Sequence, residues 1–158
     1  MIRSGAAKPR FTLDTNLMVY SIDQSEREKQ PLASQILLHA ARVDCWLMLQ
    51  SLSEFYWAIT RKRIMPGVEA AAQINDWLMF FPTAPVSAEG IRTALADAVA
   101  RRASYWDALL IATAAEAGCT LILTEDLADG ATLSGVEIHN PFTRGGGLTV
   151  RTRRLLDL

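Results

Sequence analysis

The sequence has little of what marks several large classes of protein. Its 158 residues include two cysteines, Cys45 and Cys119, which are too few for a disulfide framework; reduced thiols in a cytoplasmic protein are the simplest interpretation. No uncharged run approaches the roughly 20 residues that a membrane-spanning helix needs. The opening MIRSGAAKPR is basic but has no apolar core, so it does not resemble an export signal. We therefore expect a cytoplasmic protein that is not bound to a membrane.

An excess of charge of one sign is also missing. Sixteen Lys and Arg against seventeen Asp and Glu give a formal net charge of −1, and 50% of the residues are hydrophobic. This balance is not that of a disordered chain, nor of a protein that binds nucleic acid through bulk charge. A chain of this length is most simply one domain, and it can bury roughly 70% of the surface that its unfolded form exposes.

Continuous apolar runs alternate with helical patterns along the chain. Runs typical of buried strands occupy 11–14, 45–50 and 119–126, and shorter candidates lie at 83–86 and 135–142. Helical patterns occupy 31–43, 51–63, 67–81, 87–102 and 104–118. In the helix at 87–102, Ile91, Leu95, Ala98 and the stem of Arg102 form the expected inner face. Apolar strands separated by helices predict an α/β fold with a parallel sheet that is covered on both faces.

The two ends of the chain do not share this pattern. We predict an N-terminal extension at 1–9, a domain at 10–142 and a flexible basic tail at 143–158. The run RGGG at 144–147 is interpreted as a flexible break, and the basic segment LTVRTRRLLDL beyond it is expected to lie outside the fold.

Carboxylates occur at each junction where a well-predicted strand gives way to a helix or turn. They are Asp14, Glu54, Asp107 and the pair Glu125–Asp126. None of these junctions contains a Lys, a His or a glycine-rich phosphate loop. Ligands of open α/β sheets bind where the strands end. The presence of carboxylates at these junctions, without Lys, His or a phosphate loop, is the main functional signal in the sequence.

Each carboxylate taken alone also has a structural interpretation. Ser51 with Glu54, and Ser104 with Asp107, both fit the capping box of a helix N-terminus. Asp126 fits an ordinary turn. Asp14 is harder to explain in this way, although an Asp that starts a helix after a strand is common. The functional interpretation depends on four such residues meeting at one edge of the sheet.

Convergence of four carboxylates would require protons or a cation. Two like charges about 4 Å apart repel by roughly 4 kcal/mol at an effective dielectric constant of 20. Oxygen ligands without His or Cys suit Mg²⁺ or Mn²⁺ and not zinc. Such sites hydrolyse phosphodiesters with a metal-activated water, and no protein nucleophile is evident here.

Four segments together resemble the PIN-domain ribonucleases, most closely the VapC-type toxins of bacterial toxin–antitoxin pairs. The segments are LDTN, SEF, YWDALLIATA and LILTEDL followed by DG and NPF, and the resemblance covers about residues 11–142. It implies a three-layer α/β/α sandwich, cleavage of RNA with Mg²⁺ or Mn²⁺, a homodimer, and a cognate antitoxin that blocks the site.

Carried over by position, the resemblance implies an acidic site of Asp14, Glu54, Asp107 and Asp126. Asp14 and Asp107 are the surest direct metal ligands, and Asn16 and Thr124 are polar residues that orient the site. The resemblance leaves the roles of Glu125 and Asp129 open. Candidates for contacts with RNA phosphates are Arg61, Lys62, Arg63, Arg101 and Arg102, which are equally well explained as solvated helix ends. Trp57 and Trp106 are interpreted as core or dimer contacts rather than as platforms for bases.

Two alternatives remain. A phosphatase or receiver domain also places acidic residues at strand ends. It needs a second Asp two residues from the first, or a phosphorylatable Asp in mid-domain, together with a Lys after a later strand. Position 16 is Asn, and no Lys follows Lys62. The other alternative is a catalytically silent PIN-like domain that binds RNA or a protein partner, which a metal-dependent cleavage assay would distinguish.

Overall fold

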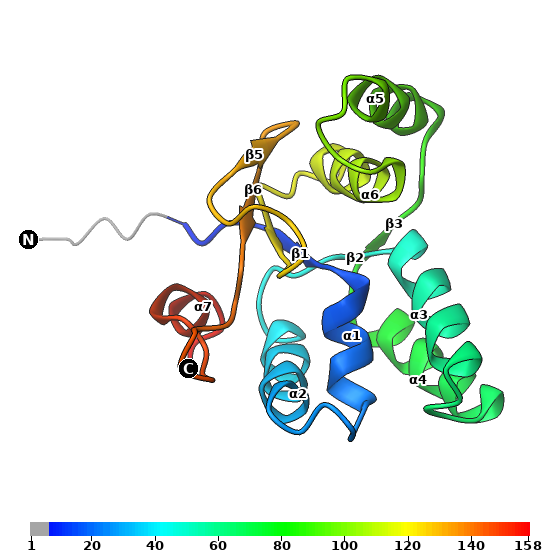
Figure 1. Ribbon diagram of the computed structural model, residues 1–158, viewed down its shortest axis with the longest axis vertical. Helices are drawn as coiled ribbons and strands as arrows, with labels where there is room; N and C mark the ends of the chain where they lie inside the picture. Colours follow the sequence, from blue (N-terminus) through cyan, green and yellow to red (C-terminus); the bar gives the residue numbers. More distant parts are fainter. Residues whose placement is uncertain (1–6) are drawn as a thin grey trace, which may run out of the picture.

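The computed structural model describes residues 7–158, and strands and helices alternate along most of this range (Figure 1). In chain order the elements are β1 (Phe11–Leu13), α1 (Thr15–Ile22), α2 (Lys29–Ala40), β2 (Leu47–Met48), α3 (Leu49–Arg61), α4 (Gly67–Phe80), β3 (Thr83–Ala84), α5 (Ala88–Val99), α6 (Tyr105–Glu116), β4 (Leu121–Leu123), β5 (Thr132–Leu133), β6 (Val136–His139) and α7 (Val150–Leu155). The strands and helices expected from the sequence are present, and the strands are shorter than the apolar runs that predicted them.

The central sheet is mainly parallel, as predicted. Its strand order is β1-β4-β6-β5, and only the β5–β6 pair is antiparallel. A second, parallel pair, β2–β3, continues it, because the backbone of Phe11 bonds to Asp44 and Trp46 just before β2. The parallel strands therefore direct their carboxyl ends to one edge, where Asp14 N–H donates to the carbonyl of Leu123 at 3.0 Å.

The two faces of the sheet are covered by different helices, which makes the three-layer sandwich. Leu121 and Leu123 of β4 pack with Phe11 against a core that includes residues of α1, α2, α3 and α4. Ile122 points to the opposite face and packs with Ile111 of α6, and α5 lies outside α6 (Figure 1). This alternation explains why β4 is apolar without interruption.

The expectations about the two cysteines and about membrane-spanning helices can be compared with the structure. Cys45 and Cys119 are buried, unpaired with each other, and lie just before β2 and β4; burial raises the pKa of both thiols. Within residues 7–158, no helix combines the length and the hydrophobicity required to span a bilayer.

Helix α5 presents a different face to the protein from the one that we expected. Ile91 and Leu95 are 39% and 51% exposed, whereas Gly90, Ala94 and Asp97 are buried. Ala94 packs against Ala108 and Leu109 of α6. Small side chains let two helices approach closely, and they therefore occupy the contact while the larger ones face outward. The prediction of an inner face at Ile91 and Leu95 was wrong.

The chain after Phe142 packs on the domain, in contrast to the flexible tail that we expected. Leu148, Leu155 and Leu156 are at most 5% exposed and belong to the same core as Phe11. Thr149 caps α7 by accepting a bond from Thr152 N–H. The many arginines of this segment suggested a solvated tail, but its leucines and its capping threonine form a short docked helix.

Two ion pairs join the segment after Phe142 to other parts of the chain. Lys8 forms an ion pair with Asp157, and Arg151 of α7 binds Glu137 of β6 through two bonds of 2.6 and 2.8 Å. Residues 1–6 of the predicted N-terminal extension lie outside the described residues.

We predict that truncation after Phe142 strongly destabilises the protein. Removal of Leu148, Leu155 and Leu156 takes away three buried side chains, each of which contributes about 1.5–3 kcal/mol. The thermal midpoint should fall by roughly ten degrees or more in a domain of this size. Calorimetry of the truncated protein, with the exposed-residue variant Arg154→Ala as control, tests this. An unchanged midpoint in the truncated protein would show that α7 does not contribute to the core.

Candidate active site

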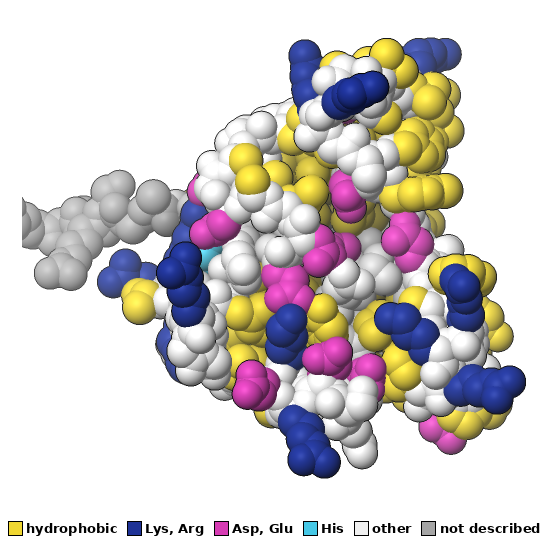
Figure 2. Space-filling model, in the orientation of Figure 1, with side chains coloured by type: hydrophobic (Ala, Val, Ile, Leu, Met, Phe, Trp, Pro, Cys, Tyr) yellow, Lys and Arg dark blue, Asp and Glu magenta, His cyan; other side chains and the backbone are white. Residues whose placement is uncertain are grey.

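The four predicted carboxylates line one cavity of about 640 Å³ at the carboxyl edge of the sheet. Asp14 comes from the end of β1, Glu54 from α3, Asp107 from α6 and Asp126 from the turn after β4. Asn16, Gln50, Trp57 and Trp106 line the same cavity. In Figure 2, acidic side chains gather near the centre of the face shown, in a hollow below the layer formed by α5 and α6. The convergence on which the functional interpretation depends is therefore present.

Asp14 occupies the N-cap position of α1, yet its side chain makes no capping bond. Its carboxylate accepts a hydrogen bond from Thr124 Oγ1 at 2.8 Å instead. The pKa of Asp14 is raised from 3.8 to about 6, chiefly by burial; the charges of Asp126 and Asp107 also raise it, and the bond from Thr124 opposes the rise. The ionised form of Asp14 is thus unfavourable until a proton or a cation compensates it.

Glu54 does not belong to a capping box. Helix α3 begins at Leu49, two residues before Ser51, so Ser51 lies within the helix and cannot cap it. The carboxylate of Glu54 is held by Gln50 Nε2 at 2.6 Å and by Thr15 Oγ1 at 3.3 Å. The capping interpretation of Glu54 was wrong, and its carboxylate is directed to the cavity by neighbouring polar groups.

Asp107 does belong to a helix cap. Ser104 Oγ accepts a bond from Asp107 N–H at 3.2 Å and donates one to Asp107 Oδ2 at 2.6 Å. The same carboxylate also lines the cavity. Gln50 of α3 donates to the carbonyl of Trp106 at 3.1 Å, which joins the helix of Glu54 to the helix of Asp107.

Asp126 is fixed by the two residues that we expected to orient the site. Asn16 Nδ2 donates a hydrogen bond to the Asp126 carboxylate. The Asp126 N–H donates to Thr124 Oγ1 at 3.1 Å. Thr124 thus connects the backbone of Asp126 to the carboxylate of Asp14.

Glu125 and Asp129 interact elsewhere. Glu125 accepts bonds from Tyr20 at 2.5 Å and from Lys29 at 2.7 Å; burial tends to raise the pKa of Glu125, but these two bonds lower it below its usual value. Asp129 accepts a bond from the N–H of Asn140 at 2.9 Å. Neither residue lines the acidic cavity, and the contacts of both anchor the turn that carries Asp126.

Sequence reasoning missed the roles of Gln50, Trp57 and Trp106. Gln50 lies four residues before Glu54, a spacing that could have shown that the two share a helix face. Trp57 and Trp106 are 60% and 62% exposed at the cavity, so they are not core residues, and their alternative role as dimer contacts stays a prediction.

The basic residues proposed to contact RNA lie outside the lining of this cavity. Arg61 stacks on the Trp57 ring, with its guanidinium carbon 4.5 Å from the ring centroid. Arg102 pairs with the buried Asp97 at 3.0 Å. Lys62 and Arg63 line a different cavity next to α1 and α4. Of the candidates, Arg61 lies beside a cavity-lining residue.

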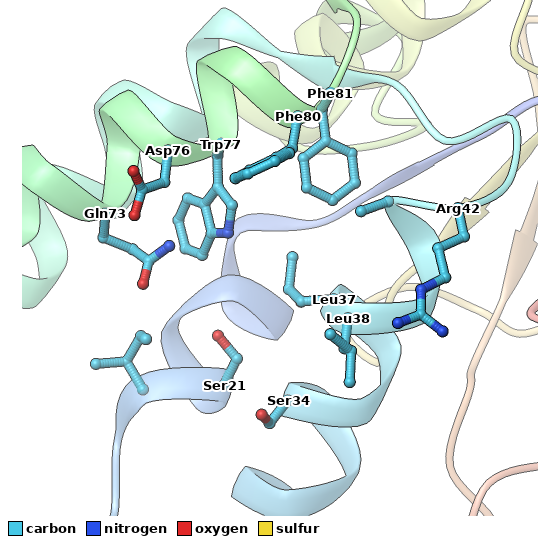
Figure 3. Close-up of a pocket in the computed structure, with 12 residues that line it drawn as sticks. Ser21, Ser34, Leu37, Leu38, Arg42, Gln73, Asp76, Trp77, Phe80 and Phe81 are labelled. Carbon is cyan, nitrogen blue, oxygen red and sulfur yellow. The ribbon is translucent and has the colours of Figure 1, made fainter.

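A further cavity of about 530 Å³ lies between α2 and α4 (Figure 3). Trp77, Phe80 and Phe81 face Leu37 and Leu38 across it. Its charged residues are one acid and one base, Asp76 and Arg42. It is an apolar groove and does not have the side chains for acid–base or metal chemistry.

The acidic cavity fits a hard divalent cation by the chemistry of its donors. Every candidate ligand in it is an oxygen. In the part of the chain that the structure describes, no three Asp, Glu, His or Cys side chains are close enough to bind one ion directly. Mg²⁺ commonly takes one or two carboxylates and keeps several waters, so this spacing suits it better than it suits zinc.

The fold and the cavity define an α/β protein with an acidic site at the carboxyl edge of a parallel sheet. The family model of the PIN domain matches residues 11–128, and the chain belongs to this family. No curated protein sequence matched significantly.

Two solved structures share the fold. VapC20 of Mycobacterium tuberculosis, a toxin that cleaves the sarcin-ricin loop, is 18% identical with a TM-score of 0.59, over 73% of this chain and 91% of that chain. VapBC2 of Rickettsia felis, bound to a DNA fragment from its promoter, is 15% identical with a TM-score of 0.58, over 82% of this chain and 97% of that chain.

Proposed function

We propose that this protein is a metal-dependent endoribonuclease that hydrolyses RNA phosphodiester bonds as the toxin of a toxin–antitoxin pair. The observation that carries the proposal is the cavity in which Asp14, Glu54, Asp107 and Asp126 meet. Membership of the PIN domain family and the shared fold of VapC20 support it.

In this proposal Asp14 and Asp107 hold Mg²⁺ or Mn²⁺, and Glu54 and Asp126 bind it directly or through water. The metal, when bound, activates a water and stabilises the charge that develops on the phosphate. Thr124 holds the carboxylate of Asp14, Asn16 holds that of Asp126 and Gln50 holds that of Glu54. Such hydrogen bonds fix the ligand orientation before the substrate arrives.

We further propose that the protein forms a homodimer and binds a cognate antitoxin in the cytoplasm. Ile91, Leu95 and Val99 form an exposed apolar stripe along α5, and Val99 is 84% exposed. Exposed apolar patches mark surfaces that bind other proteins. The protein pair VapBC2 shares the fold and supports the antitoxin partner.

The purified protein should cleave single-stranded RNA in Mg²⁺ or Mn²⁺ and lose that activity in EDTA. The expectation rests on a site whose only reactive side chains are oxygen ligands. Gel analysis of labelled RNA, with Mg²⁺ added back after EDTA as control, measures this. Unchanged cleavage in excess EDTA would rule out the metal mechanism, and no cleavage of any RNA would indicate a silent PIN-like domain.

A further inference from the structure

Two exposed tryptophans stand at the acidic cavity, one from each of the helices that carry Glu54 and Asp107. Trp57 of α3 is 60% exposed, and Trp106 of α6 is 62% exposed. Trp106 packs edge-on against Tyr105, with ring centroids 5.2 Å apart, and its carbonyl accepts the bond from Gln50. An indole ring buries a large apolar area when a ligand covers it. Two indoles that are exposed at the same cavity therefore indicate a binding surface for a ligand or partner.

One face of α3 carries three different kinds of group in succession. Glu54, Trp57 and Arg61 follow at spacings of three and four residues, which places them on the same side of the helix. At a rise of 1.5 Å per residue, the steps between them are about 4.5 and 6 Å. The guanidinium of Arg61 lies on the Trp57 ring, so the face runs from a carboxylate to an aromatic surface with a cation beside it. Single-stranded nucleic acids are bound by such combinations of aromatic rings and cations.

The charges around the cavity indicate that RNA would bind here mainly through its bases. A net charge of −1 and four carboxylates do not attract a polyanion, and Lys62, Arg63 and Arg102 lie elsewhere. Affinity for RNA must therefore come largely from contacts that do not depend on charge. An apolar protein surface placed here would bury the carboxylates without compensating them. A bound nucleotide can stack its base on an indole while its phosphate contacts the metal ion that, in the proposed function, the carboxylates bind.

We propose that Trp57 and Trp106 are the residues on which unpaired bases next to the cleaved phosphate stack, and that these two indoles supply most of the affinity of the site for a single strand. The proposal rests on the proposed ribonuclease function. Bases in a duplex already stack on one another and cannot reach the indoles, whereas splayed bases of a loop can.

Binding of RNA in the absence of cleavage tests the proposal. Fluorescence anisotropy of a labelled single-stranded RNA, and of the same strand in a blunt duplex, is measured in the Asp14→Asn background with EDTA. Trp57→Ala and Trp106→Ala should each weaken binding of the single strand about tenfold. Trp57→Phe should retain most of the affinity, and the duplex should bind poorly to all variants. Tyr56→Ala is the matched control, because Tyr56 is an exposed aromatic of the same helix that does not line the cavity.

Three results would overturn the proposal: unchanged affinity in both alanine variants, equal affinity for duplex and single strand, or loss of binding together with conversion of a dimer to a monomer in sedimentation. The last would show that the indoles contact a second subunit. The assay does not require hydrolysis, so it separates the two proposals. Tryptophan-dependent binding without cleavage by the wild type would support stacking and refute the nuclease, and cleavage without tryptophan-dependent binding would do the reverse.

Discussion

Replacing Asp14 with asparagine is expected to lower RNA cleavage by orders of magnitude and to make the metal-free protein more stable at pH 7. Cleavage falls because a metal contact is lost. Stability rises because the variant no longer holds an unfavourable anion. The rise in pKa from 3.8 to about 6 corresponds to a loss of about 3 kcal/mol in the free energy of unfolding. The neutral asparagine can restore at most this amount.

The sign of this effect depends on pH. The folded protein binds the Asp14 proton more tightly than the unfolded chain does, so in EDTA the wild type loses stability as the pH rises from about 4 to about 6. The difference between Asp14→Asn and the wild type should be largest above pH 6 and small below pH 4. Thermal melts in EDTA across this range measure it. A variant that is less stable than the wild type at pH 7 would contradict the crowded acidic site.

Replacing Asp107 with asparagine is expected to separate catalysis from helix capping. Asparagine keeps the shape of the side chain, so the free energy of unfolding should change by about 1 kcal/mol or less, while cleavage falls at least a hundredfold. Ser87→Ala is the control for the loss of a helix cap, because Ser87 caps α5 by accepting a bond from Gly90 N–H at 2.9 Å and does not line the cavity. It should lose about 1 kcal/mol of stability and keep its activity. Similar activity in the two variants would show that Asp107 is only part of the cap.

The positions of Asp14, Asp107 and Asp126 could be predicted because they follow from simple patterns. Apolar runs that end in Asp14 and Asp126 mark parallel strands, and parallel strands direct their ends to one edge of the sheet. The helical period at 104–118 placed Asp107 in a first turn. These inferences need only local periodicity and the geometry of a parallel sheet.

Other features depend on which neighbours the chain meets. Helix α3 begins at Leu49 because β2 is only two residues long, and Ser51 therefore lies inside the helix. The buried face of α5 carries its small residues Gly90 and Ala94, which let α6 approach closely, and not its largest side chains. Leu155 and Leu156 are buried because α7 docks on the core, which the arginines around them concealed. Local patterns do not contain this information.

Direct binding of Mn²⁺ tests the central claim, that the four carboxylates form one metal site. The free ion can be counted by electron paramagnetic resonance in titrations of the wild type and of the Asp14→Asn and Asp107→Asn variants, with Ser87→Ala as control. We predict that the wild type and Ser87→Ala bind Mn²⁺ with similar affinity, and that each Asn variant binds it at least tenfold more weakly. Equal affinity in all four proteins would contradict the account.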